Sequence, residues 1–163
     1  MRDSPKPNLE GRTIAQSAVS MAQVMLSSQA NAAGNVHGGE IMMMMDNAAG
    51  VVAARHTRSY VVTARVENIN FFEPIYIGNL VTISGRLTFV SQHTMEVELM
   101  VIAEDLLTGR QVQALTAYFV MVCLDQAGRP KQVPTLILQT DDERRRFEQG
   151  QGRYEERKRT SGY

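Results

Sequence analysis

One carboxylate, Asp46, interrupts the apolar stretch that begins after Glu40 in the segment GNVHGGEIMMMMDNAAGVVAAR, residues 34–55. Moving a carboxylate into apolar surroundings costs free energy unless it is hydrogen-bonded or meets solvent in a cleft. Desolvation also raises its proton affinity, which suits a group that takes a proton from an attacking molecule. Two interpretations of Asp46 are open from the residues alone: a general base, or a structural acid satisfied by a neighbouring backbone group or helix end.

The glycine pair Gly38 and Gly39 comes directly before this stretch, and Asp46 follows Gly39 by seven residues, about two helical turns. Backbone N–H groups of glycine can approach a ligand without an intervening side chain, and the positive end of a helix that begins there would polarise a carbonyl oxygen. With an acid downstream, the pair predicts an oxyanion hole. An isolated glycine pair more often indicates loop flexibility.

The three histidines do not have the spacing of metal ligands, so we expect no metal site. His37 lies beside the glycines and is a candidate for ligand contact, although a single loop histidine is more often a bystander. His56 and His93 are explained by a helix dipole and by solvent exposure. The four methionines at 42–45 spread around a helix, and we expect most of them in the core.

Residues from about 39 to 56 lack the alternation of a strand and exceed its usual length, which predicts one long helix that must be covered by a sheet. Residues 13–26 predict a strand before it. Four β-rich segments follow: YVVTARVENINFF, NLVTISGRLTFV, TMEVELMVIAED and RQVQALTAYFVMVCL. The expected fold class is α+β, with an antiparallel sheet of about five strands around one central helix.

The C-terminal segment predicts a charged helix, with Thr140 as N-cap, acids in the first turn and basic residues beyond. We expect this helix to be interrupted or frayed near Gly150 and Gly152. The expected organisation is a lead-in over residues 1–12, one domain over 13–138, and a charged helix and tail over 139–163.

Composition limits the function classes. The chain has 163 residues, of which 44% are hydrophobic, and its 17 basic and 17 acidic residues create no overall positive field for nucleic acid or an anionic membrane. The single cysteine, Cys123, excludes an intrachain disulfide and favours a reducing, cytoplasmic location. No apolar run is typical of a signal peptide or membrane span, so we expect neither export nor membrane insertion.

Three motifs, in this order, resemble the hotdog-fold acyl-CoA thioesterases over about residues 13–148. They are NAAGNVHGGE leading into MMDNAAG, then VVTARVENINFFEPIYIGNLV, and then DQAGRPKQVP after the last strand. The resemblance implies a hotdog fold and hydrolysis of acyl-CoA to a carboxylic acid and coenzyme A. Glu40 and Asn79 depart from the family pattern, which commonly has an aromatic residue and an aspartate there, and these departures concern substrate preference.

The resemblance also implies roles for individual residues. The family residue that matches Asp46 is a general base or nucleophile, and the one that matches Asn31 completes the site, usually from the other subunit of a dimer. The family places a hydroxyl or small residue near the thioester at the position of Thr63. Without the resemblance, Asn31 would be assigned to an Asx-turn and Thr63 to ordinary strand chemistry.

Coenzyme A carries three phosphate groups, which guanidinium groups bind well. Arg144, Arg145 and Arg146 are the candidates, with Arg65 and Arg86 as rivals, although a charge run is usually a solvated face. The expected partners are acyl-CoA and further copies of the chain, as a dimer or a trimer of dimers. No cofactor is expected, because coenzyme A is part of the substrate and product.

Two alternative functions remain open. One is a non-catalytic acyl-CoA-binding or sensing module that keeps the pocket without turnover. The other is a hotdog dehydratase or hydratase acting on 3-hydroxyacyl thioesters, which normally uses a histidine with a paired acid. His37 followed by Glu40 resembles that pair only superficially.

Overall fold

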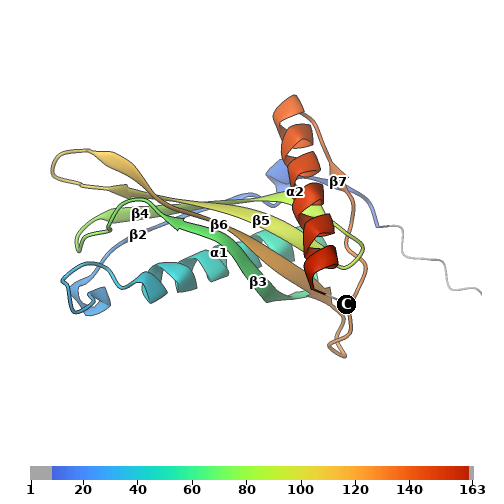
Figure 1. Cartoon of the computed structure of the whole chain (residues 1–163), viewed down its shortest axis with the longest axis horizontal. Helices are drawn as coiled ribbons and strands as arrows, with labels where there is room; N and C mark the ends of the chain where they lie inside the picture. Colours follow the sequence, from blue (N-terminus) through green and yellow to red (C-terminus); the bar gives the residue numbers. More distant parts are fainter. Residues whose placement is uncertain (1–8, 162–163) are drawn as a thin grey trace, which may run out of the picture.

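The structure, a computed structural model, describes residues 9–161, so most of the expected lead-in and the last two residues of the tail lie outside the described residues. One long helix, α1 (Gly38–Thr57), lies against one face of a five-stranded antiparallel sheet. A second helix, α2 (Asp141–Thr160), crosses the opposite face near one end (Figure 1). The expected α+β hotdog arrangement is confirmed.

The sheet has the order β2-β4-β5-β6-β3, so the strands on either side of α1 in the sequence form its two edges. Its strands are β2 (Val19–Val24), β3 (Tyr60–Phe71), β4 (Leu80–Val90), β5 (Thr94–Glu104) and β6 (Gln111–Leu124). The short strands β1 (Arg12–Thr13) and β7 (Leu136–Ile137) pair in parallel, and the 3-10 turns η1 (Ile14–Gln16) and η2 (Ser27–Gln29) flank β2. The chain therefore crosses beneath the whole sheet as α1.

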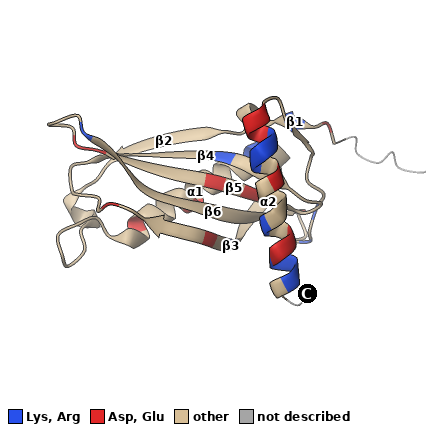
Figure 2. Ribbon diagram, turned by 45° about the horizontal axis from the view of Figure 1, so that its top comes forward, with Lys and Arg blue, Asp and Glu red and all other residues tan. Residues whose placement is uncertain are grey.

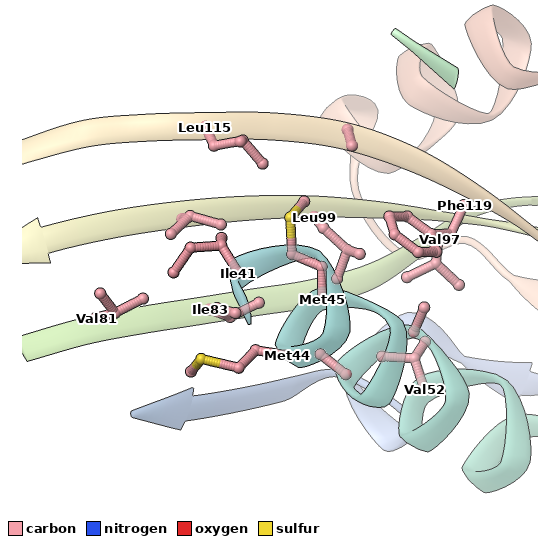
Figure 3. Close-up of a cluster of buried hydrophobic side chains, with 14 of the residues drawn as sticks. Ile41, Met44, Met45, Val52, Val81, Ile83, Val97, Leu99, Leu115 and Phe119 are labelled. Atoms are coloured by element: carbon pink, nitrogen blue, oxygen red, sulfur yellow. The ribbon is translucent and has the colours of Figure 1, made fainter. Parts of the chain in front are cut away.

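The core fills the space between α1 and the sheet. Fully buried side chains of α1 face those of the strands, and Figure 3 shows Ile41, Met45, Val52, Leu99 and Phe119 among them. Met44 and Met45 are buried and Met42 packs against the core, which confirms the expectation for most of the methionines. The fourth, Met43, lies on the opposite, uncovered face of α1 together with Asp46 and Asn47.

The helix α2 is continuous, so the expected interruption near Gly150 and Gly152 is wrong. A Cβ atom on Gly150 would lie 2.7 Å from the Cβ of Phe89 and 3.0 Å from Oε1 of Glu96, so this glycine is required by close packing on the sheet. Tertiary packing here outweighs the roughly 1 kcal/mol that a helical glycine costs relative to alanine. The predicted cap is confirmed, because the Oγ1 of Thr140 accepts the N–H of Glu143 at 3.1 Å.

Charged groups join α2 to the sheet; in Figure 2, basic and acidic segments alternate along the ribbon of α2, and β3, β4 and β5 carry charged segments. Glu96 on β5 is 1% exposed, and its carboxylate accepts hydrogen bonds from Arg153 at 2.8 Å and from the hydroxyl of Thr88 at 2.6 Å. Arg157 bridges Glu96 at 3.3 Å and Glu67 of β3 at 2.7 Å. This buried network offsets the cost of desolvating Glu96.

Between residues 9 and 161, no helix has the length and apolar character needed to span a membrane.

Candidate active site

Asp46 lies on the uncovered face of α1, where the hydroxyl of Thr63 on β3 donates a hydrogen bond to its Oδ1. The same hydroxyl lies 3.5 Å from the sulfur of Met121 on β6. Among residues 9–161, no backbone N–H group and no basic side chain bonds to Asp46, and its Oδ2 has no partner. The interpretation of Asp46 as a structural acid satisfied by neighbouring backbone therefore finds no support in the part of the chain that the structure describes.

The backbone N–H group of Gly38, the first residue of α1, has no acceptor among the described residues. The N–H of Gly39 is occupied, because it donates to Nδ1 of His37 at 3.0 Å. His37 is the N-cap of the helix, and its carbonyl also accepts the N–H of Glu40 at 2.9 Å. Of the predicted pair of oxyanion donors, Gly38 is available in this arrangement, and His37 has a structural function as a cap.

Asn31 organises the loop before α1. Its Oδ1 accepts the backbone N–H groups of Ala33 at 3.0 Å and Asn35 at 3.1 Å, as an Asx-turn residue does. The side-chain amide group of Asn31 has no acceptor among residues 9–161 and so remains a free donor. Asn31 and Gly38 line the same hollow of about 220 Å³, together with Phe71 of β3. The structure thus brings two of the predicted site residues together.

The acid and these donors lie apart within one protomer. Asp46 does not line the hollow that contains Asn31 and Gly38. Eight residues separate it from Gly38 along α1, which corresponds to about 12 Å at 1.5 Å per residue. A hollow of about 850 Å³ lies at the other end of α1 beside Arg58 and Lys131, and none of the predicted site residues lines it.

An unpaired sheet edge, that of β3, runs beside Asp46 and carries exposed apolar side chains. Within the described residues, β3 pairs only with β6, so its other edge carries unpaired backbone groups. Exposed apolar side chains of α1 and β3 flank this edge: Met43, Tyr60, Val62, Ile69 and Phe71. A long exposed edge with apolar side chains is a template for pairing with another chain.

The three consecutive arginines lie on α2, on the opposite face of the sheet from α1. Arg144 pairs with Asp141 at 2.9 Å, and Arg145 pairs with Asp142. Arg146 contacts Asp142 and also Glu98 of β5, each at 2.8 Å. Hydrogen bonds from Arg146 and Arg145 lower the pKa of Asp142 to about 2. The structure does not place these arginines beside Asp46 or Asn31, and their phosphate-binding function stays a prediction.

Arg65 belongs to a different basic cluster, whose members were not predicted from the sequence to lie together. It pairs with Glu67 at 2.6 Å and lines a polar hollow of about 450 Å³ between β3 and α2, with Arg153 and Arg157. Arg153 and Arg157 are four residues apart on α2, so the sequence does indicate that they share one face of that helix. Nothing local in the sequence linked that face to β3.

Comparisons with known proteins agree with this fold. The thioesterase superfamily profile matches residues 33–109, from the loop of Asn31 through β5. Cytosolic acyl coenzyme A thioester hydrolase of Mus musculus is 43% identical over 92% of this chain and 40% of its own length. An uncharacterized acyl-CoA thioester hydrolase of Zymomonas mobilis is 34% identical over 69% of this chain and 76% of its own length.

A solved structure described as an apo-hexameric acyl-CoA thioesterase superimposes with a TM-score of 0.88 at 29% sequence identity, over 93% of this chain and 97% of that chain. The chain thus belongs to the thioesterase superfamily and, within it, to the family of acyl-CoA thioester hydrolases. It spans about two fifths of the length of the mammalian relatives that it matches.

Proposed function

We propose that this protein hydrolyses acyl-CoA thioesters to a carboxylic acid and coenzyme A, with Asp46 as general base or nucleophile. The observation that carries the proposal is a carboxylate on the uncovered face of the central helix, held at one oxygen by Thr63 and unpartnered at the other. As a base, Asp46 takes a proton from water while the water oxygen attacks the thioester carbon, the C–S bond breaks and the departing thiolate regains a proton. As a nucleophile, its carboxylate oxygen attacks the thioester carbon, the C–S bond breaks and coenzyme A leaves as a thiolate that takes up a proton, and water then cleaves the acyl anhydride.

The oxyanion that develops on the thioester carbonyl needs hydrogen-bond donors. The free N–H of Gly38 and the free side-chain amide of Asn31 supply them from one hollow. This hollow lies about two helical turns from Asp46. We therefore assign the carboxylate and the oxyanion donors of one active site to different protomers. Asp46 and Thr63 of one protomer then act with Asn31 and Gly38 of its partner.

The unpaired edge of β3 is the proposed contact between these two protomers. Two β3 strands joined side by side would bury the apolar side chains around Met43 and Phe71 and remove the exposed edge. Such a contact is a closed two-fold dimer. The hexameric structural relative supports a larger homo-oligomer, and we propose a trimer of these dimers.

The remaining parts of the proposal concern substrate and location. Arg144 and Arg145, with side chains 52% and 60% exposed, remain candidates for the coenzyme phosphates, and Arg65 belongs to the rival basic cluster. The proposed chemistry uses protein groups alone, with no metal and no cofactor beyond the coenzyme A of the substrate. The names of the mammalian relatives support a cytosolic location.

Release of free thiol from a panel of acyl-CoAs of different chain length tests the proposal and shows the acyl preference. Binding without turnover would favour the sensing module, and hydration without thiol release would favour the hydratase. The structure gives the hydratase little support, because His37 is engaged with Gly39 and the carboxylate of Glu40 accepts a hydrogen bond from Gln29 at 3.3 Å. These two residues therefore do not form an acid–histidine pair.

A further inference from the structure

The hollow of about 220 Å³ that Asn31 and Gly38 line, which we call the Asn31 hollow, has an apolar wall. This wall consists of buried side chains from α1, β6 and the loops beside them: Val36, Ile41, Ile75, Ala114 and Leu115. Figure 3 labels Ile41 and Leu115 between the helix and the sheet. The ring of Phe71 lies beside Gly38, since a Cβ atom on this glycine would be 3.8 Å from Cε1 of the ring. A carbonyl group bound by the N–H of Gly38 therefore adjoins apolar surface.

The backbone around the Asn31 hollow is paired with itself. The N–H of Val36 donates to the carbonyl of Ile75 at 2.8 Å, and the N–H of Phe72 donates to the carbonyl of Ala114 at 2.9 Å. The amides of the pantetheine arm of coenzyme A would lose hydrogen bonds to water there, whereas an acyl chain needs only apolar contact. An apolar cavity of about 150 Å³ holds benzene, so the Asn31 hollow has room for a short acyl chain.

Glu73 is the one charged residue among the described residues that line the Asn31 hollow. It is exposed, and among residues 9–161 its carboxylate forms no ion pair, although Arg110 lines an adjacent hollow of about 140 Å³ together with it. The positive end of α1 also borders the Asn31 hollow and would favour an anion. In the proposed reaction, however, the thioester oxygen occupies that end. A negative group farther along the acyl chain meets the charge of Glu73 instead.

We propose that the Asn31 hollow receives the acyl chain and that Glu73 is a specificity-determining residue, which favours neutral acyl groups over those that end in a carboxylate. The inference rests on the proposed function, because the carbonyl must be bound at Gly38 and Asn31 for the chain to enter this hollow. Two like charges about 8 Å apart weaken binding about twofold in water and about thirtyfold at an effective dielectric constant of 20. A partly exposed site lies between these limits.

The test is thiol release from hexanoyl-CoA and adipoyl-CoA, whose acyl chains have equal numbers of carbon atoms and differ in the terminal carboxylate. The measured quantity is the ratio of kcat/KM for hexanoyl-CoA to that for adipoyl-CoA, in which effects common to both substrates cancel. We expect the unchanged protein to favour hexanoyl-CoA, and Glu73→Gln to reduce the ratio by about tenfold. Glu73→Lys should reduce it further, and added salt should reduce it in the unchanged protein.

Glu148→Gln is the matched control, because it removes an equal charge at an exposed position of α2, on the opposite face of the sheet. Its ratio should equal that of the unchanged protein. Melting temperatures and light scattering establish that each variant is folded and assembled. A ratio that is the same in the Glu73→Gln, Glu73→Lys and unchanged proteins would overturn the inference. A preference of the unchanged protein for adipoyl-CoA would overturn it as well.

Failure of the proposed function gives a different result. If the unchanged protein releases no thiol from either ester, it is not a hydrolase of these substrates. The ratio of the dissociation constants of the two esters, measured by calorimetry on the same proteins, then decides whether Glu73 selects the acyl group. Turnover of both esters with an unaltered ratio in the Glu73 variants would leave the hydrolase in place and remove the selection by Glu73.

Discussion

Thr63 on β3 and Asp46 on α1 are joined by a hydrogen bond from the threonine hydroxyl to the carboxylate, which ties the uncovered face of the central helix to the edge strand. The bond orients one carboxylate oxygen and leaves the other unpartnered among residues 9–161. A carboxylate held in this way needs little reorganisation before it acts on a substrate.

Asp46→Asn should abolish most of the turnover. Asparagine keeps the shape and can still hydrogen-bond to Thr63, but it lacks the charge and basicity that water activation requires. We expect kcat to fall at least about a hundredfold, the lower end for a positioned acid–base group, while coenzyme A binding and oligomeric state persist. Steady-state thiol release measures the loss. Near-normal turnover in a correctly assembled variant would leave Asp46 as a structural group and favour the binding module.

Thr63→Val should lower kcat by about ten- to a hundredfold, because a hydrogen bond to a charged group contributes roughly 1.5–3 kcal/mol. Valine preserves the shape and strand preference, so the fold should be unchanged. Thr63→Ser retains the hydroxyl and should restore most of the rate. Equal loss in the serine and valine variants would show that packing against Met121, and not the hydrogen bond, is what matters.

The elements that position the site were predictable because each has a strong local pattern. The structure confirms the long apolar segment over residues 39–56 as α1, and it confirms the β-rich segments after it as β3 to β6. Asp46 stands out as a carboxylate within that apolar segment, whereas Asn31 and Thr63 depended on the family resemblance. The residues around Asp46 and around Thr63 do not by themselves indicate that α1 and β3 meet at these two side chains.

The parts that were not predictable depend on contacts between distant segments. Alternation along TMEVEL places Glu96 on the outer, polar face of the sheet, yet α2 buries it beneath Arg153. Local propensity at Gly150 predicts a break, whereas the packing of that glycine on Phe89 keeps the helix continuous. In both cases the deciding contact lies more than fifty residues away.

His56 should make stability depend on pH. The residue is fully buried, its Nε2 lies 2.8 Å from the carbonyl of Pro134, and its Nδ1 has no partner. Burial, chiefly, lowers the pKa of His56, so the folded state favours the neutral ring. As the pH falls below about 6.5, the unfolded chain takes up a proton that the folded protein resists, and stability declines until the lower folded pKa is passed.

Melting temperatures between pH 8 and pH 5 measure this effect. The unchanged protein should lose more stability over this range than His56→Gln, which has no such group to protonate. His93→Gln, in the turn between β4 and β5, controls for the loss of a histidine and should follow the unchanged protein. Parallel curves for the unchanged protein and the His56 variant would contradict the assignment.

The arginines of α2 can be separated by what they contact. If Arg144 and Arg145 bind the coenzyme phosphates, replacing both by glutamine should raise KM for acyl-CoA and weaken its salt dependence, while a short thioester without the nucleotide is cleaved as before. Arg146→Gln should instead lower the melting temperature, because it removes the 2.8 Å ion pair with Glu98 and leaves Arg86, at 3.1 Å, as the partner of that partly buried carboxylate. If the variant with both Arg144 and Arg145 replaced lost the same fraction of its activity on both thioesters, the cause would be damaged folding or assembly.

A mixing experiment tests whether one site is built from two protomers. Asp46→Asn and Asn31→Ala should each inactivate a protein made of one kind of chain. In a mixed dimer, one site combines both changes, while the other combines the intact Asp46 of one chain with the intact Asn31 of its partner. Statistical pairing makes about half of the dimers mixed, so co-expression should restore about a quarter of the unchanged activity. Each chain alone, measured at the same total concentration, provides the baseline. If Asp46 and Asn31 acted within a single chain, every site would carry one change, and the mixture would stay as inactive as its components.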